Sequence, residues 1–241
     1  MPVVLIFFAA AYGAVAGLLV PHARYRLSVE PGEPWQSTGP CGHPVTGWLG
    51  LPRCGECGEG YGQGALWPVA VTAVAAAALA AAVGPRPELA VWLLAAPVGV
   101  LLAEVDRSVR RLPDVLTLPL ALALVALLGA AAWTPGAGGS WTGALLGGLA
   151  LGGGYFVLLL VRPSGMGFGD VKLALGLGCA LGWYGWPVVY LGALASLALG
   201  SLHGLALLAA RRADRRSMIA FGPWMLTGAL LGVLAGAAAG L

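Results

Sequence analysis

Long apolar runs constrain this chain more than any other feature of its sequence. Eight such runs divide the 241 residues, and most approach the roughly 20 helical residues that cross a hydrocarbon core. Only 10% of the residues are charged, against about 25% in a typical soluble domain. We therefore predict an all-α polytopic membrane protein, because a helix satisfies its own backbone hydrogen bonds in lipid. The predicted spans are residues 2–20, 65–83, 89–103, 115–133, 143–161, 171–184, 187–210 and 219–241.

The placement of Lys and Arg predicts the orientation of these spans. Twelve of the 13 basic residues fall in four segments, namely 21–64, 104–114, 162–170 extended to Lys172, and 211–218. Positive charge is retained on the cytoplasmic side. We therefore expect a plasma (inner) membrane protein with both termini outside. Its basic residues form short clusters between apolar runs, which favours lipid as their partner and does not indicate a nucleic-acid surface.

Two aspartates lie where predicted spans meet the cytoplasm. Asp106 follows the third run and Asp170 begins the sixth. Ionisable groups at membrane depth are costly and tend to be functional. Helix capping explains Asp170 well, but it explains Asp106 poorly, because the dipole at a helix C-terminus disfavours an anion. Two carboxyls held close share a proton, so one can act as a base towards water while the other acts as an acid. The pair predicts aspartic-protease chemistry.

The residues around these aspartates suggest further roles. Gly165, Gly167 and Gly169 precede the second aspartate; glycines allow positive φ and the close approach of a substrate backbone. Asp114 stands at the expected start of the fourth span, after a proline. We predict that Asp114 caps this helix and is not catalytic.

Segment 21–64 carries a candidate metal site. It contains Cys41, His43, Cys54 and Cys57, and the last two form a Cys-x-x-Cys pair flanked by glycines. A reducing cytoplasm disfavours disulfides. Three thiols and one imidazole would supply the four ligands of a structural zinc ion. A loop with unpaired thiols is the alternative interpretation.

Three blocks of the sequence resemble the type IV prepilin peptidases, a family of membrane aspartic proteases. Asp106 with residues 112–120 resembles the first catalytic aspartate and the proline-aspartate stretch after it. Residues 167–173 resemble the GxGD motif and its following lysine, here Lys172. Residues 220–224 resemble a C-terminal Phe-Gly-Pro block. The resemblance extends from about residue 65 to the end of the chain.

This resemblance implies an activity and a substrate. Asp106 and Asp170 would be the catalytic pair, and Asp114 would not take part. The substrates would be prepilins or pseudopilins, in which a short basic leader precedes a hydrophobic helix. The enzyme would cut the leader at the cytoplasmic face and would need no cofactor for proteolysis.

The N-terminal region departs from the family pattern. We therefore divide the chain into residues 1–64, a first membrane helix with a cysteine-containing loop, and a peptidase domain of residues 65–241. An asparagine typical of the family is missing, and Cys41 alone remains of one Cys-x-x-Cys pair. For this reason we do not assign the family's second activity, which is S-adenosylmethionine-dependent N-methylation of the product.

Two other functions are compatible with the sequence pattern. A catalytically silent component of a pilus or secretion assembly would use its aspartates only as helix caps. A transporter would use them to bind protons or cations, but transport sites usually lie near the bilayer midplane in interrupted helices. Both aspartates lie at the expected membrane edge, which favours the peptidase.

Overall fold

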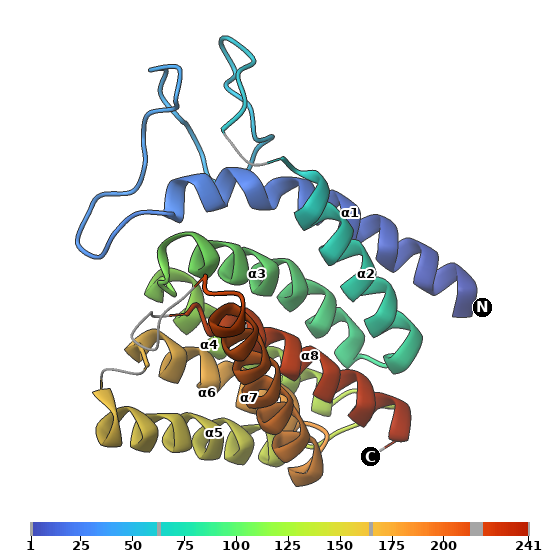
Figure 1. Cartoon of the computed structure of the whole chain (residues 1–241). Coiled ribbons are helices and arrows are strands. Elements are labelled where there is room, and N and C mark those ends of the chain that lie inside the picture. The colour runs from blue at the N-terminus through green and yellow to red at the C-terminus, as the bar shows by residue number, and fades with distance from the viewer. Residues whose placement is uncertain (1, 62–63, 164–165, 213–218, 241) are drawn as a thin grey trace.

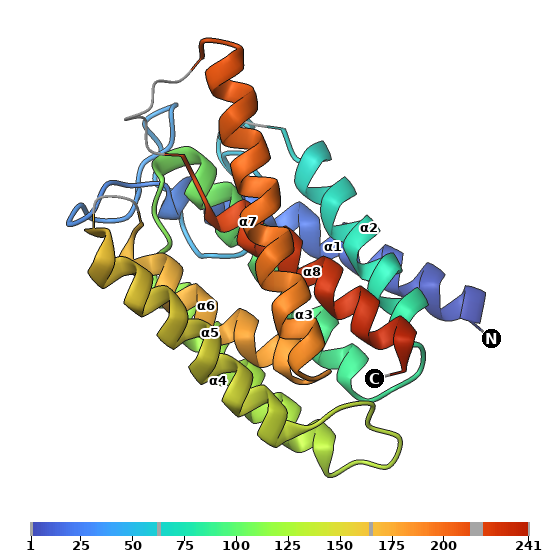
Figure 2. The same cartoon turned by 60° about the horizontal axis from the view of Figure 1, so that its bottom comes forward.

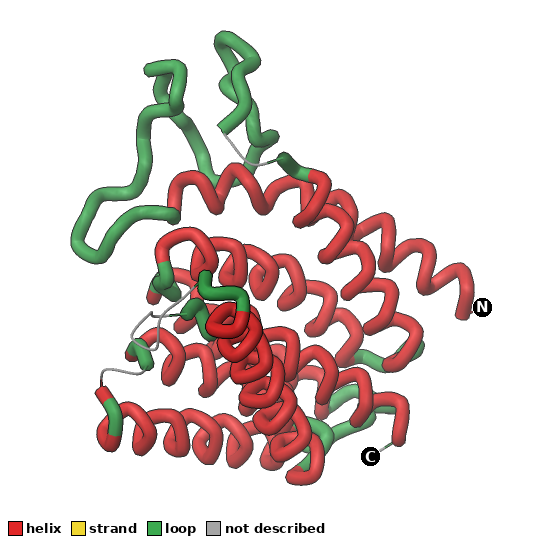
Figure 3. Tube along the Cα trace, in the orientation of Figure 1, coloured by secondary structure: helices red, strands yellow, loops and turns green. Residues whose placement is uncertain are grey.

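The chain folds into a bundle of helices (Figure 1). The computed structural model describes residues 2–61, 64–163, 166–212 and 219–240. Within them the helices are α1 (Pro2–Leu27), α2 (Leu66–Val83), α3 (Glu88–Val109), α4 (Asp114–Ala132), α5 (Trp141–Val161), α6 (Phe168–Gly182), α7 (Trp186–Ala209) and α8 (Gly222–Ala239). No strand occurs in these ranges (Figure 3), and the loop after α1 has only two isolated bridges. The all-α prediction is confirmed.

Seven of the helices in the described ranges are long and apolar enough to cross a membrane. The exception is α6, which has 15 residues. It packs against α4, α5, α7 and α8, and 11 of its residues are buried. Because its neighbours separate α6 from lipid, its length need not match the hydrocarbon thickness. Within the described residues, the polytopic architecture therefore consists of seven long helices and one short, buried helix that four of them surround.

Two helices extend beyond their predicted apolar runs. We predicted spans ending at residues 20 and 103, whereas α1 continues to Leu27 and α3 to Val109. We had assigned residues 21–27 to the loop from the sequence. In the structure they are helical and belong to α1. Polar side chains of the two added segments contact each other, which stabilises helix outside the apolar runs. The extension of α3 also places Asp106 inside a helix.

Glycines bring α5 and α6 into close contact, because small residues let helices in lipid approach each other closely. A Cβ atom added to Gly147 would lie 2.5 Å from the carbonyl oxygen of Gly178. Gly143 and Gly182 face each other in the same way one turn along the helices. Larger residues would push the helices apart and would move α6, which carries Asp170.

The chain alternates in direction through the bundle. Figures 1 and 2 both place the N- and C-terminal ends at the same end of the bundle, away from the α3–α4 connection. The loop that follows α1 projects from the bundle, while α7 crosses obliquely over its neighbours.

Candidate active site

Asp106 is held by the backbone of a distant helix. It lies in the last turn of α3 and is 4% exposed. Its Oδ2 atom accepts a hydrogen bond of 2.9 Å from the N–H of Gly222, the first residue of α8. The first N–H groups of a helix have no partner within that helix, so they favour an anion at this position. A carboxylate at the unfavourable end of α3 is thereby stabilised by the favourable end of α8.

Asp170 is held within its own helix. It is the third residue of α6, it is 9% exposed, and its Oδ2 atom accepts the N–H of Gly167 at 3.0 Å. The N–H of Asp170 in turn donates to the carbonyl of Gly167 at 3.1 Å. This reciprocal pair fixes the first turn of α6 and orients the carboxyl group. Asp106 and Asp170 lie close enough for their charges to interact.

Leu112, in the α3–α4 connection, contacts the backbone beside both aspartates. A Cβ atom added to Gly169 would lie 2.9 Å from the Leu112 Cβ. One added to Gly222 would lie 2.8 Å from Oδ2 of Asp106 and 3.3 Å from a Leu112 methyl group. The two glycines therefore let α6 and α8 approach the end of α3.

Three glycines precede Asp170, and the structure describes two of them, Gly167 and Gly169. Gly165 lies outside the described residues. Gly167 has φ −83° and ψ 150°, an extended conformation open to any residue, and its contribution is the N–H that Asp170 accepts. Gly169 contacts Leu112 of its own chain, so the space beside it is filled. Neither Gly167 nor Gly169 uses the positive φ that the sequence suggested.

Lys172 and Asp114 form an ion pair with each other. The Lys172 Nζ lies 2.7 Å from Oδ2 of Asp114 and 4.7 Å from the centre of the Phe168 ring. Asp114 is the first residue of α4, as expected, but its side chain makes no capping hydrogen bond. Its carboxylate instead connects α4 to α6, because Lys172 projects from the first turns of α6 towards it.

Two residues near the site carried no functional prediction of their own. Gly222 supplies the N–H that Asp106 accepts, and its only signal was its place in the Phe-Gly-Pro block. Tyr155 on α5 is buried, and its ring lies 6.3 Å from that of Phe221, the residue before Gly222. Nothing distinguishes Tyr155 in sequence from other aromatic residues in an apolar run.

The four predicted metal ligands come together in the loop after α1. One donor atom from each of Cys41, His43, Cys54 and Cys57 lies within 4.8 Å of all the others. The backbone N–H groups of Cys57 and Glu56 donate to the Cys54 sulfur and lower the pKa of this thiol to about 6. Burial and the neighbouring thiols instead raise the pKa of Cys57 to about 11, so Cys54 is the thiol that ionises first, and the thiolate is the form that binds metals. The closeness of the four donor atoms is what allows the cluster to hold a metal ion.

The geometry around His43 suits a metal ligand. Its Nδ1 lies 3.5 Å from the Cys54 sulfur, so this nitrogen faces the cluster. Its Nε2 lies 3.4 Å from a carboxylate oxygen of Glu56. A carboxylate on the second ring nitrogen is the usual way in which proteins orient a metal-binding histidine.

The two buried carboxyls can perform acid–base chemistry. Oδ2 of each accepts a backbone N–H, and within the described part of the chain Oδ1 of each has no hydrogen-bond partner. One oxygen of each group is therefore fixed, while the other can meet water or substrate. Such a pair can take a proton from water and donate one to a carbonyl oxygen without any other nucleophile.

Comparisons with known proteins point to one family. The model of the type IV leader peptidase family matches residues 89–208, which include both buried aspartates. A prepilin leader peptidase/N-methyltransferase of Aeromonas salmonicida is 34% identical over 210 residues, or 81% of this chain and 69% of the relative. A protein of the same name from Pseudomonas putida is 31% identical over 236 residues, or 92% of this chain and 78% of the relative.

A further relative from Burkholderia pseudomallei, also named prepilin leader peptidase/N-methyltransferase, is 34% identical over 227 residues. The match covers 86% of this chain and 67% of the relative. No solved structure matches the chain.

Proposed function

Because the chain belongs to the type IV leader peptidase family, we propose that Asp106 and Asp170 are the residues with which it cuts its substrate. The protein is a multi-pass membrane protease that cleaves the leader peptides of type IV prepilins. One observation carries the assignment of the two residues. Two buried carboxyls from different helices lie close enough to interact, and each is oriented by a backbone N–H.

The proposed reaction needs one carboxylate and one carboxylic acid. The carboxylate takes a proton from water, and the water oxygen attacks the scissile carbonyl carbon. The acid donates its proton to the carbonyl oxygen, which gives a neutral tetrahedral intermediate. The aspartate that took the proton from water then gives it to the leaving nitrogen, while the other aspartate takes a proton from a hydroxyl group of the intermediate. The C–N bond breaks, the new carboxyl group and amine are released, and the pair returns to its starting state. Each aspartate alternates between acid and base, so no metal or cofactor enters these steps.

Substitution of the aspartates tests this assignment. Leader cleavage of a co-expressed prepilin would be compared for wild type, Asp106→Asn, Asp170→Asn and Asp114→Asn. Asn keeps the shape of Asp but cannot exchange the proton. We expect cleavage to be lost in the first two variants and kept in Asp114→Asn, whose carboxylate pairs with Lys172. Cleavage by either of the first two variants would refute the proposed pair.

We further propose that the active-site end of the bundle faces the cytoplasm of the plasma (inner) membrane. The support is the concentration of 12 of the 13 basic residues in the four sequence segments that follow the first, third, fifth and seventh apolar runs. The substrate would then present a leader on this side, followed by a hydrophobic helix in the membrane. An epitope tag fused to the C-terminus should be digested when protease is added outside intact spheroplasts. Protection of that tag would contradict the proposed orientation.

For the loop cluster we propose zinc as the metal. Three thiolates and one imidazole are a common donor set for structural zinc, and the spacing of the four donor atoms is compatible with a tetrahedron. The zinc would hold the loop together without entering the reaction. Our proposal for this chain does not extend to the N-methyltransferase activity that the relatives' names contain.

A further inference from the structure

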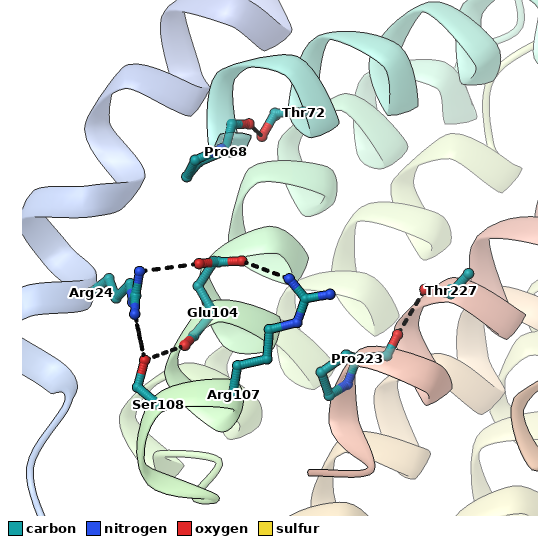
Figure 4. Close-up of polar contacts among 8 residues, drawn as sticks. All are labelled: Arg24, Pro68, Thr72, Glu104, Arg107, Ser108, Pro223 and Thr227. Atoms are coloured by element: carbon teal, nitrogen blue, oxygen red, sulfur yellow. Dashed lines mark hydrogen bonds and ion pairs between the residues drawn. The ribbon is translucent and has the colours of Figure 1, made fainter. Parts of the chain in front are cut away.

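The last turn of α3 is tied to α1 through Arg24. Its Nη1 lies 3.2 Å from Oε2 of Glu104, while Nε and Nη2 donate to the Ser108 hydroxyl at 3.1 and 2.7 Å (Figure 4). The Ser108 hydroxyl in turn donates to the Glu104 carbonyl at 2.8 Å. We refer to Arg24, Glu104 and Ser108 as the Arg24 clamp.

Within the Arg24 clamp, the ion pair of Arg24 and Glu104 is mostly enclosed by protein, whereas Ser108 is exposed. The Glu104 side chain is 7% exposed and that of Arg24 is 14% exposed. The other carboxylate oxygen of Glu104 accepts a hydrogen bond from Arg107 at 3.3 Å (Figure 4). Loss of one partner from a buried ion pair leaves the other charge poorly compensated, so the surroundings rearrange. The arrangement of these side chains is therefore strongly coupled to the position of α3.

The clamp brackets Asp106. Glu104 and Ser108 lie two residues before and two residues after it, and α3 ends at Val109. Asp106 projects from the same turn towards Gly222 of α8. Any shift of this turn relative to α1 therefore also moves the Asp106 carboxyl relative to its hydrogen-bond donor.

Other protein side chains do not cover every side of this turn. A cavity of about 240 Å³ lies along α3 between α2 and α8, and Ala103, Glu104 and Arg107 are among its lining residues. Beside the cavity, polar contacts hold the end of α3. Arg107 and Ser108 bind Glu104 within the helix, and Arg24 binds Glu104 and Ser108 from α1.

We propose that Arg24 is a positioning residue of the peptidase, acting through the last turn of α3 on Asp106. The inference rests on the proposed catalytic role of Asp106. It extends the functional machinery to α1, which lies outside the matched residues 89–208 and before the boundary that the sequence suggested at residue 64. The N-terminal helix would then be required for full catalytic rate, in addition to carrying the loop.

A steady-state assay on detergent-solubilised prepilin tests this role. We expect Arg24→Gln to lower kcat by about 10- to 100-fold, because a misplacement of about 1 Å can cost about 100-fold. KM should stay within twofold, since the proposed role of Arg24 involves α3 and not contact with the substrate. Arg24→Lys keeps a charge opposite Glu104 but has fewer donors, so its kcat should fall between those of wild type and Arg24→Gln. All rates are normalised to monodisperse protein from size exclusion, so unfolded material does not count.

Arg26 offers a matched control at the same helix end. Its guanidinium donates to the carbonyls of Gln36 and Gly47 and stacks 4.1 Å from the Trp48 ring, so its contacts lie within the loop. Arg26→Gln should retain the wild-type kcat. An equal loss of kcat in Arg26→Gln would overturn the proposal, because it would show a general effect of the N-terminal region.

A double variant distinguishes a common mechanism from independent effects. If Arg24 acts through Glu104, then Arg24→Gln/Glu104→Gln should lose no more activity than the more damaged single variant. Losses that multiply, an unchanged kcat in Arg24→Gln, or a rise in KM alone would each contradict the positioning role. Asp106→Asn is measured in parallel. If that variant still cleaves, the proposed function fails; if it is inactive while Arg24→Gln is normal, only the clamp proposal fails.

Discussion

The N–H of Gly222 donates to Oδ2 of Asp106 at 2.9 Å, across 116 positions of the sequence. This bond joins the end of α3 to the start of α8 and directs the carboxyl group into the site. The residue at position 222 must provide a donor and at the same time leave room for the carboxylate. Glycine satisfies both conditions, because an added Cβ would lie 2.8 Å from the oxygen that accepts the bond.

We expect Gly222→Ala to impair cleavage. The new methyl group would displace the Asp106 carboxyl or α8 by several tenths of an ångström, which should lower kcat by about 10- to 100-fold. Alanine is compatible with the first turn of a helix, so the protein should still fold. The measurement is kcat on purified prepilin, with thermal unfolding followed in the same preparation.

Gly154→Ala is the matched control for this substitution. Gly154 also lies in a membrane helix, but an added Cβ would meet nothing within 4 Å. This variant should cleave at the wild-type rate. Full activity of Gly222→Ala would show that the contact with Asp106 does not constrain catalysis.

The two glycines on either side of Phe168 should respond differently to alanine. Gly169→Ala places a methyl group 2.9 Å from the Leu112 Cβ and 3.3 Å from its carbonyl oxygen, so α6 must shift and kcat should fall at least tenfold. Gly167→Ala keeps the N–H donor and has no atom closer than 3.6 Å, so activity should stay within about twofold. Assays of both variants side by side check this, and the reverse order of the two losses would contradict the site geometry.

The Asp114–Lys172 pair should contribute little stability and no catalysis. The Asp114 side chain is 59% exposed, and exposed pairs are worth at most about 1 kcal/mol. Asp114→Asn and Lys172→Gln should therefore lower the free energy of unfolding by similar small amounts. The double variant should lose about as much as either single one, because the two residues share one interaction. Thermal unfolding in detergent measures the effect, and additive losses would show that each residue has a separate role.

Purified protein should contain about one zinc ion per chain, bound by the loop cluster. Cys57→Ser should lower the zinc content strongly, because a hydroxyl group is a poor zinc ligand. Cys179→Ser is the control, since this thiol is buried in α6 and outside the cluster. Metal analysis of the three proteins decides the outcome. Equal zinc in all three would contradict the predicted ligand set.

Most of the fold could be predicted from the long apolar runs alone. All eight predicted runs correspond to helices, because a backbone in lipid has few alternatives to a helix. The sequence could not show where α1 and α3 end, because their last turns are polar and are stabilised by contacts between them. It also could not show that α6 is shielded from lipid, which depends on how four other helices pack around it.

The sequence indicated which residues belong to the candidate site, but not which other residues they contact. Asp106 and Asp170 stood out because carboxylates are rare at a membrane edge, and the four loop ligands because of their donor chemistry. The predicted cap at Asp114 is instead an ion pair with Lys172, 58 positions away. Contacts such as Gly222 with Asp106 or Arg24 with Glu104 depend on helix packing, which no local pattern specifies.

The most direct measurement of the central claim is single-turnover cleavage of a purified prepilin by Asp106→Asn, by Asp170→Asn and by the double variant. Residues that act as one unit show losses that do not multiply. We predict that each single variant falls to the rate of the enzyme-free control and that the double variant is no slower. Measurable cleavage by either single variant, with a further loss in the double variant, would show that the two aspartates do not form the catalytic pair.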